Sequence, residues 1–339
     1  MHILWALLIS LAVPVTSQPN HDHAAPLTLA STFTMPQEVS GNFDHLAIDT
    51  RGKRLFVTPE GYNSVIVFDY TTGQMVHVIR GIGTPHAVLY REDLKRIYVT
   101  DGNPGELKIF DGATYRLLKS ITLLAHTDSV RYDPNTRYLY IVTGGKEAKQ
   151  TDSIISIADT TSGTIVGNIR IESDALEAMA IDANAGILYV SDKAKNQVDV
   201  VDLRSRSLIA AWPITLGQNN TSLALDEAHH RLFVGCRSGH LVVFDTTSGK
   251  EITSLPMTKG VDDMVYDPAT KRLYASCGDN QGIVEVYEQT TPGKLVSIAR
   301  VPSGPAGKTA LLSTRLHRYF VSVPRHGESA ASVLVYEVH

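Results

Sequence analysis

Residues 44–58 read DHLAIDTRGKRLFVT: an alternating apolar stretch, a tight turn and a second apolar stretch. Six more segments repeat this pattern, namely HAVLYREDLKRIYVT from His86, DSVRYDPNTRYLYIV from Asp128, EAMAIDANAGILYVS from Glu177, TSLALDEAHHRLFVG from Thr221, DDMVYDPATKRLYAS from Asp262 and KTALLSTRLHRYFVS from Lys308. A repeat of roughly 40–50 residues that holds several short strands is typical of propeller blades. The sequence therefore predicts an all-β fold, a seven-bladed β-propeller.

Each repeat has an anchor, the residue that closes its first apolar stretch. The anchors are Asp49, Tyr90, Asp133, Asp182, Asp226, Asp267 and Ser313. In the first repeat the expected strands are 44–49, 54–58, 64–69 and 74–79. The last repeat offers only 308–313, 318–323 and 332–338 before the chain stops. We expect Leu27–Thr34 to supply the missing fourth strand, because an open ring would leave exposed sheet edges.

The N-terminus has the features of an export signal. Ile3–Val15 is apolar, too short to span a bilayer, and is followed by the small residues Val15 and Ser17 at the −3 and −1 positions of a cleavage site. We expect a signal peptide over 1–17, a leader with the closing strand over 18–41, one propeller domain over 42–339, and a periplasmic or secreted protein. The alternative interpretation of Ile3–Val15 is a buried N-terminal strand.

Composition narrows the partners. The chain has 339 residues, 43% of them hydrophobic, and a net charge of −4 without a basic block. This argues against nucleic acid as a partner. Ile3–Val15 is too short to span a bilayer, and no other segment is apolar enough to cross a membrane. Cys236 and Cys277 occupy equivalent positions in neighbouring repeats, where Cα atoms are usually too far apart for a disulfide, so two free thiols are expected.

The second apolar stretches carry a family resemblance. RLFVT, RIYVT, YLYIV, ILYVS, RLFVG and RLYAS resemble the YVTN repeat of bacterial surface and periplasmic β-propellers. The segments DHLAID, VRYD, LFVGCR, DDMVYD and KTALL further resemble a group of secreted bacterial YVTN-type propellers. The resemblance covers the chain from about Asn42 onward. It implies the propeller fold and export, and no particular reaction.

Polar residues recur where the inner strands begin. Five positions before each anchor stand Asp44, Pro85, Asp128, Glu177, Thr221, Asp262 and Lys308. The next position holds His45, His86 and Asp263, and the ends of the second strands add Asp101 and Asp192. Because the inner strands of a propeller surround its channel, these side chains are expected to meet at one acidic channel mouth.

Converging carboxylates need compensation. One solution is a divalent cation, preferably Ca²⁺, held by Asp44, Asp128, Glu177 and Asp262, since Ca²⁺ takes oxygen ligands. These positions are similar to those of the metal ligands in gluconolactonase-like propellers, which are six-bladed and also use Asn. Pairing with Lys308, His45 and His86, or raised carboxyl pKa values, are the other solutions. The structural alternative is a solvated channel wall with no ligand.

Two functions follow from this mouth. The first is a binding scaffold for a small ligand, an ion or a protein partner. The alternative is a divalent-metal-dependent hydrolase of lactonase type, in which the metal polarises the carbonyl and Asp263, His45 or His86 carries protons. The sequence contains no Walker loop, nucleophile elbow or Cys-x-x-Cys motif. It leaves open whether the protein is an enzyme.

Overall fold

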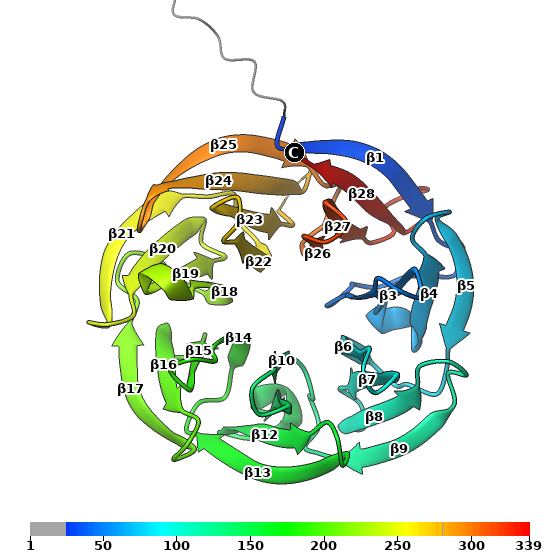
Figure 1. The fold of residues 1–339 in the computed structure, drawn as a ribbon, viewed down its shortest axis with the longest axis horizontal. Coiled ribbons are helices and arrows are strands. Elements are labelled where there is room, and N and C mark those ends of the chain that lie inside the picture. The colour runs from blue at the N-terminus through cyan, green and yellow to red at the C-terminus, as the bar shows by residue number, and fades with distance from the viewer. Residues whose placement is uncertain (1–24, 280) are drawn as a thin grey trace, which may run out of the picture.

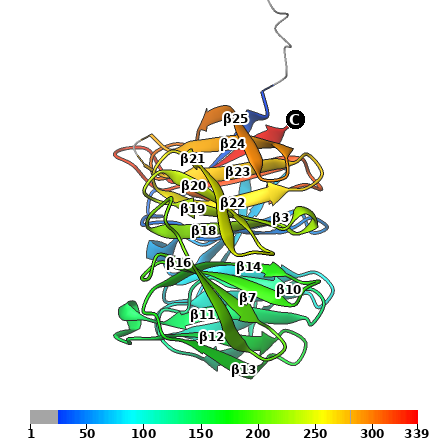
Figure 2. The same ribbon diagram turned by 90° about the vertical axis from the view of Figure 1, so that its left-hand side faces the viewer.

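The computed structural model describes residues 25–279 and 281–339, and these form seven four-stranded sheets arranged as blades around a central axis (Figure 1). Figure 2 shows the same ring edge-on. The predicted seven-bladed β-propeller is confirmed. The predicted signal peptide lies outside the described residues, so export stays a prediction.

Each blade is an antiparallel sheet, and in the first six blades the strands run outward from the channel in sequence order. The first three blades consist of β2 (Ala47–Asp49), β3 (Arg54–Val57), β4 (Val65–Asp69) and β5 (Gln74–Ile79); β6 (Pro85–Arg91), β7 (Arg96–Asp101), β8 (Glu106–Asp111) and β9 (Leu117–Thr122); and β10 (Val130–Asp133), β11 (Tyr138–Gly144), β12 (Ser153–Asp159) and β13 (Thr164–Ile171). The fourth and fifth consist of β14 (Leu176–Asp182), β15 (Ile187–Asp192), β16 (Gln197–Asp202) and β17 (Ser207–Pro213); and β18 (Asn220–Asp226), β19 (Arg231–Cys236), β20 (His240–Asp245) and β21 (Lys250–Pro256).

The sixth blade consists of β22 (Val261–Asp267), β23 (Arg272–Cys277), β24 (Ile283–Thr291) and β25 (Lys294–Pro302), and the seventh of β26 (Thr309–Ser313), β27 (Arg318–Val323), β28 (Ser332–Val338) and β1 (Leu27–Thr34). Three short 3-10 helices interrupt the described chain, at Glu60–Tyr62, Lys146–Ala148 and Glu227–His229. No helix among the described residues has both the length and the apolar character needed to cross a bilayer.

The turn after each anchor keeps the seven inner strands in phase. The residue just before every second strand has a positive φ, at Lys53, Lys95, Arg137, Gly186, His230, Lys271 and His317. Where the anchor is an aspartate, its carboxylate can accept hydrogen bonds from the turn, as where Asp49 accepts from the backbone N–H groups of Arg51 and Gly52 at 3.2 and 2.9 Å. Such Asx turns hold the backbone in a fixed shape. Residues five positions before the anchors therefore reach the same end of the channel. The second blade departs from the predicted spacing: Arg91, and not Tyr90, lies opposite the first residue of the second strand, so His86 takes the place expected for Pro85.

Aromatic side chains fill the spaces between blades. Every second strand carries one at the same position: Phe56, Tyr98, Tyr140, Tyr189, Phe233, Tyr274 and Phe320, all buried. Neighbouring blades diverge outward, and large flat side chains occupy that wedge efficiently. Cys236 and Cys277 lie in the same interior as buried, free thiols, as expected.

The ring closes as predicted from the short last repeat. β1 pairs antiparallel with β28, with Leu27 opposite Val338 and Thr34 opposite Ser332. The N-terminal strand thus becomes the outer strand of the seventh blade, beside the C-terminus (Figure 1).

Candidate functional site

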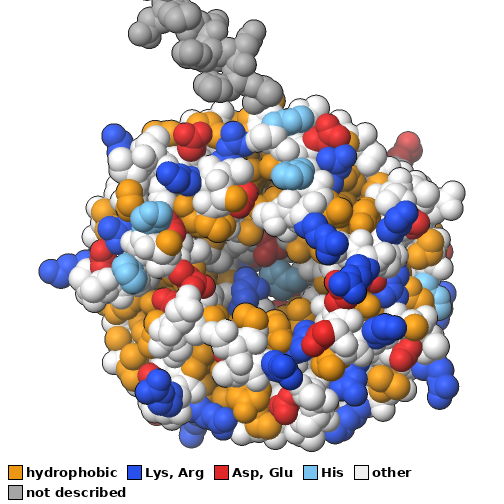
Figure 3. All heavy atoms as spheres, viewed as in Figure 1, with side chains coloured by type: hydrophobic (Ala, Val, Ile, Leu, Met, Phe, Trp, Pro, Cys, Tyr) orange, Lys and Arg blue, Asp and Glu red, His pale blue; other side chains and the backbone are white. Residues whose placement is uncertain are grey.

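One end of the channel forms a polar pocket of 150 Å³, here called the mouth pocket. It is lined by Asp44, His45, Glu60, His86, Asp128, Ser129, Glu177, Ala178, Thr221, Arg237, Asp262 and Lys308. Every blade contributes at least one of these residues. Figure 3 shows the molecule hollowed at its centre, with charged side chains inside the hollow.

The structure brings together most of the residues singled out in the sequence. Asp44, Asp128, Glu177, Asp262, Lys308, His45 and His86 all line the mouth pocket. Three further ionisable residues were not anticipated: Glu60 and Arg237, which line the pocket, and Lys193, which reaches Glu177 from its rim. Lys193 and Arg237 directly follow the second strands β15 and β19, and Glu60 opens the 3-10 helix after β3.

Asp101 and Asp192 are not where the sequence placed them. They end β7 and β15, but both side chains point into their blades and are fully buried. Asp101 accepts hydrogen bonds from the backbone N–H groups of Gly83 and Thr84, each at 2.8 Å. Asp192 accepts from Ser173 Oγ at 2.6 Å. Successive side chains of a strand face opposite ways. In the fourth and fifth blades it is therefore the residue after the second strand, Lys193 or Arg237, that reaches the mouth.

Two of the mouth carboxylates are neutralised by basic side chains. Asp262 pairs with Lys308 Nζ at 2.7 Å and also with Arg237. Glu177 pairs with Lys193 Nζ at 2.6 Å. Two of the four acids expected to bind a cation are therefore already neutralised by basic side chains.

Asp44 is held between two histidines. Its carboxylate lies 2.9 Å from His86 Nδ1 and 3.4 Å from His45 Nε2. Burial disfavours the charged form of His45, but Asp263 and Asp44 outweigh it and raise the His45 pKa to about 10. In the same way burial is outweighed for His86 by Asp44 and Asp128, and its pKa rises to about 9. Both imidazoles are therefore protonated at neutral pH and offset carboxylate charge.

Two acids in the mouth pocket have no close counter-charge. The nearest basic atoms to the Asp128 carboxylate are His86 Nδ1 at 3.8 Å and His126 Nε2 at 3.9 Å. Burial and the charge of Asp44 raise the pKa of Asp128. The same two causes raise the pKa of Glu60. Among the mouth carboxylates, Asp128 and Glu60 thus have the weakest counter-charge.

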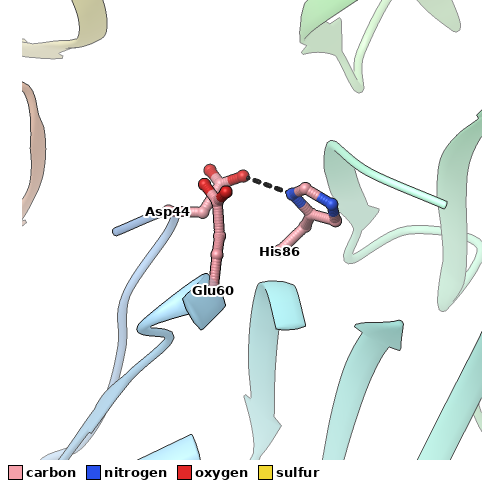
Figure 4. A group of neighbouring side chains, drawn as sticks. All are labelled: Asp44, Glu60 and His86. Atoms are coloured by element: carbon pink, nitrogen blue, oxygen red, sulfur yellow. Dashed lines mark hydrogen bonds and ion pairs between the residues drawn. The ribbon is translucent and has the colours of Figure 1, made fainter. Parts of the chain in front are cut away.

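Three ligand atoms converge on that side. One atom each from Asp44, Glu60 and His86 lies within 4.8 Å of the other two, the only such group of three among the described residues. Figure 4 shows the Asp44 and Glu60 carboxylates next to each other, with the His86 ring opposite them on the second blade. Of the four predicted metal ligands only Asp44 belongs to this group. Asp128, Glu177 and Asp262 line the same pocket but do not converge with it.

Asp263, the expected proton carrier, faces a different space. Its carboxylate lies 3.1 Å from His45 Nδ1 and accepts a hydrogen bond from the backbone N–H of Ala310 at 2.9 Å. It lines a deeper cavity behind the mouth pocket, and His45 lines both.

The buried Asp192 has a carboxylate neighbour, and this gives a pH-dependent prediction. Asp199 is fully buried, and its pKa is raised to about 6 by burial and by Asp192. Because the folded-state pKa exceeds the unfolded one, the stabilising protonated form is complete below about pH 4, and stability falls as the pH rises through about 6. Asp199→Asn should therefore raise the free energy of unfolding at pH 8 by about 2 kcal/mol and leave it little changed at pH 4.

Urea denaturation at both pH values measures this difference. Glu328→Gln, on an exposed loop, is the matched control and should leave the pH profile of the wild-type protein unchanged. A variant Asp199→Asn that is less stable than wild type at pH 8 would contradict the raised pKa.

No family model matches the chain. It is 30% identical over 123 residues to the uncharacterized protein YncE of Salmonella typhi, a match that covers 34% of each chain. It is 22% identical over 174 residues to the seven-bladed beta-propeller protein Rv1057 of Mycobacterium tuberculosis, covering 50% of this chain and 44% of that protein. The resemblance to YVTN-type propellers is confirmed. The matches span between a third and a half of the length of these relatives.

Solved structures share the propeller fold of this chain. A chain of the mitotic checkpoint complex aligns with a TM-score of 0.75 over 99% of both chains at 14% identity. U3-55K aligns with a TM-score of 0.74 over 93% of this chain at 13% identity. At this level of identity the likeness concerns the fold alone, because propellers host many unrelated activities.

Proposed function

We propose that this protein is a binding propeller whose mouth pocket holds a divalent cation through Asp44, Glu60 and His86. The observation that supports this most directly is the approach of their ligand atoms to within 4.8 Å of one another. Carboxylate oxygens combined with an imidazole nitrogen suit Zn²⁺ and related transition metals better than Ca²⁺, which prefers oxygen alone. These ligands therefore favour Zn²⁺ over the Ca²⁺ that was expected from the sequence.

The charge balance around these residues favours the same proposal. Glu177 and Asp262 are already paired with Lys193, Lys308 and Arg237. Asp128, by contrast, has no basic atom closer than 3.8 Å. A divalent cation on Asp44, Glu60 and His86 would displace the proton of His86, because an imidazole binds metal only in its neutral form. The exchange would add one net positive charge beside Asp128.

Titration of chelator-treated protein with Zn²⁺, with Ca²⁺ in parallel, tests the cation site. We expect saturable Zn²⁺ binding by calorimetry and a rise in melting temperature that follows mass action. Glu60→Gln and His86→Gln should each weaken binding about tenfold or more, in the range seen when a metal-site residue is altered. Ca²⁺ should bind more weakly than Zn²⁺.

The matched control is Glu177→Gln, which alters an acid of the same pocket whose partner is Lys193. It should leave Zn²⁺ affinity almost unchanged. Loss of binding in Glu177→Gln as large as in Glu60→Gln would point to general electrostatic attraction, and absence of saturable Zn²⁺ binding in the wild-type protein would remove the proposal.

A further inference from the structure

Behind the mouth pocket the channel widens into a second space, here called the inner cavity. Its volume is 470 Å³, and every blade contributes to its wall. The wall is mainly apolar and includes Leu46, Val88, Ile181, Leu223, Met264 and Leu311. Ligand pockets of proteins have about 300–1,000 Å³ and are mostly apolar with a few placed polar groups. The inner cavity has both properties.

Arg131 of β10 is the basic residue that projects into this apolar space without an ion-pair partner. Its Nη1 donates to the backbone carbonyl of Val130 at 2.9 Å, and no described carboxylate lies within 4 Å of its guanidinium. A guanidinium has five N–H donors, which normally bond to carboxylates or other acceptors. Burial lowers the pKa of Arg131, and Asp263 opposes this only from a distance. The Arg131 side chain is partly buried, lines the inner cavity and has no described anion beside it.

Asp263 is not available to serve as that anion. Its oxygens are engaged by His45 Nδ1 at 3.1 Å and by the backbone N–H of Ala310 at 2.9 Å. It belongs to the sixth blade, whereas Arg131 belongs to the third. The protein therefore supplies a partner for Asp263 and none for Arg131.

We propose that the inner cavity binds a medium-chain monocarboxylate, with the carboxylate on Arg131 and the hydrocarbon body against the apolar wall. A bidentate pair with a planar carboxylate matches the guanidinium geometry. A single negative charge is preferred, because a doubly charged phosphate would leave one charge uncompensated near Asp263 in an apolar space. This site shares no ligand residue with the cation site at the mouth.

Calorimetry with octanoate, 1-octanol and acetate tests this site. Octanoate should bind the wild-type protein, and acetate should bind much more weakly because it lacks the apolar body. Arg131→Gln should weaken octanoate binding about tenfold or more, as expected for loss of a hydrogen-bonded charge pair. The affinity for 1-octanol should be the same in both proteins, since it carries no charge.

Two comparisons keep the test specific. Arg51→Gln removes an exposed arginine that pairs with Glu92 and lines neither the mouth pocket nor the inner cavity, and it should bind octanoate like the wild-type protein. Chelator-treated protein should also keep its octanoate affinity, which separates this site from the cation site. Equal octanoate affinity in wild type and Arg131→Gln, or no octanoate binding to the wild type, would overturn the proposal. An unchanged melting temperature of Arg131→Gln shows that the fold is intact, as expected from its one hydrogen bond.

Discussion

Removal of residues 1–34 is expected to lower the free energy of unfolding by roughly 3–6 kcal/mol compared with removal of residues 1–24, because it exposes two buried apolar side chains. These are Leu27 and Phe33 of β1, which are only 3% and 4% exposed. Phe33 also packs on Phe68 of the first blade, with ring centroids 5.7 Å apart. The strand thus seals the seventh blade and joins it to the first. Its loss leaves β28 as an open edge.

Urea denaturation of the two truncated proteins measures this effect. The double variant Leu27→Ala/Phe33→Ala separates the causes, since it keeps the β1 backbone but loses the buried side chains. It should account for most of the loss. A synthetic peptide of residues 25–36, added in excess to the protein that lacks 1–34, should restore part of the melting temperature. Equal stability of the two truncated proteins would show that β1 does not close the ring in solution.

The closing strand illustrates how far sequence reasoning reached for the fold. The bounds of β1, β5, β27 and β28 follow the prediction residue for residue, because alternation and turn signals repeat in every blade and each copy supports the others. The first inner strand is shorter than predicted and begins at Ala47. Before it the backbone N–H of His45 bonds to the carbonyl of His86 in the next blade. A hydrogen bond between two blades leaves no pattern in the local sequence, so this shortening could not be predicted.

The mouth pocket was predictable only in part. Residues before the anchors converge because the turn fixes their phase, and Asp44, Asp128, Glu177 and Asp262 do so. No similar turn motif marks the last residues of the second strands, so the sequence does not show which of these residues points toward the channel. A shift of one residue there reverses the direction of a side chain, which explains why Asp192 was expected in place of Lys193.

Ion pairing within the mouth pocket was also beyond the sequence. Arg237 follows the fifth blade's second strand, yet its partner Asp262 lies on the sixth blade. The sequence shows that acids and a few basic residues gather round the ring, but not which of them touch. Because Glu177 and Asp262 are paired, the candidate cation site moves to Asp44, Glu60 and His86.

Lys108→Met is expected to destabilise the protein by about 3–5 kcal/mol, because it leaves a buried carboxylate without its counter-charge. Asp101 is fully buried, and its Oδ2 lies 2.9 Å from Lys108 Nζ. The same ammonium lies 2.6 Å from Glu106 Oε2 and is itself only 8% exposed. Three backbone N–H groups, from Gly83, Thr84 and Asn103, also bond to Asp101. They hold the carboxylate in place but do not neutralise it.

A double-mutant cycle measured by urea denaturation tests this pair. Asp101→Asn with Lys108→Met should cost clearly less than the sum of the two single variants, because the uncompensated charge is then absent. The matched control is Arg170→Met, which breaks the 2.7 Å pair with Asp152 where the arginine side chain is 67% exposed. Its cost should stay below about 1 kcal/mol, as for other surface ion pairs. If the losses in free energy of unfolding of the two single variants simply add up, the charge pair contributes nothing. Asp101 would then stabilise the fold only through its hydrogen bonds to the backbone.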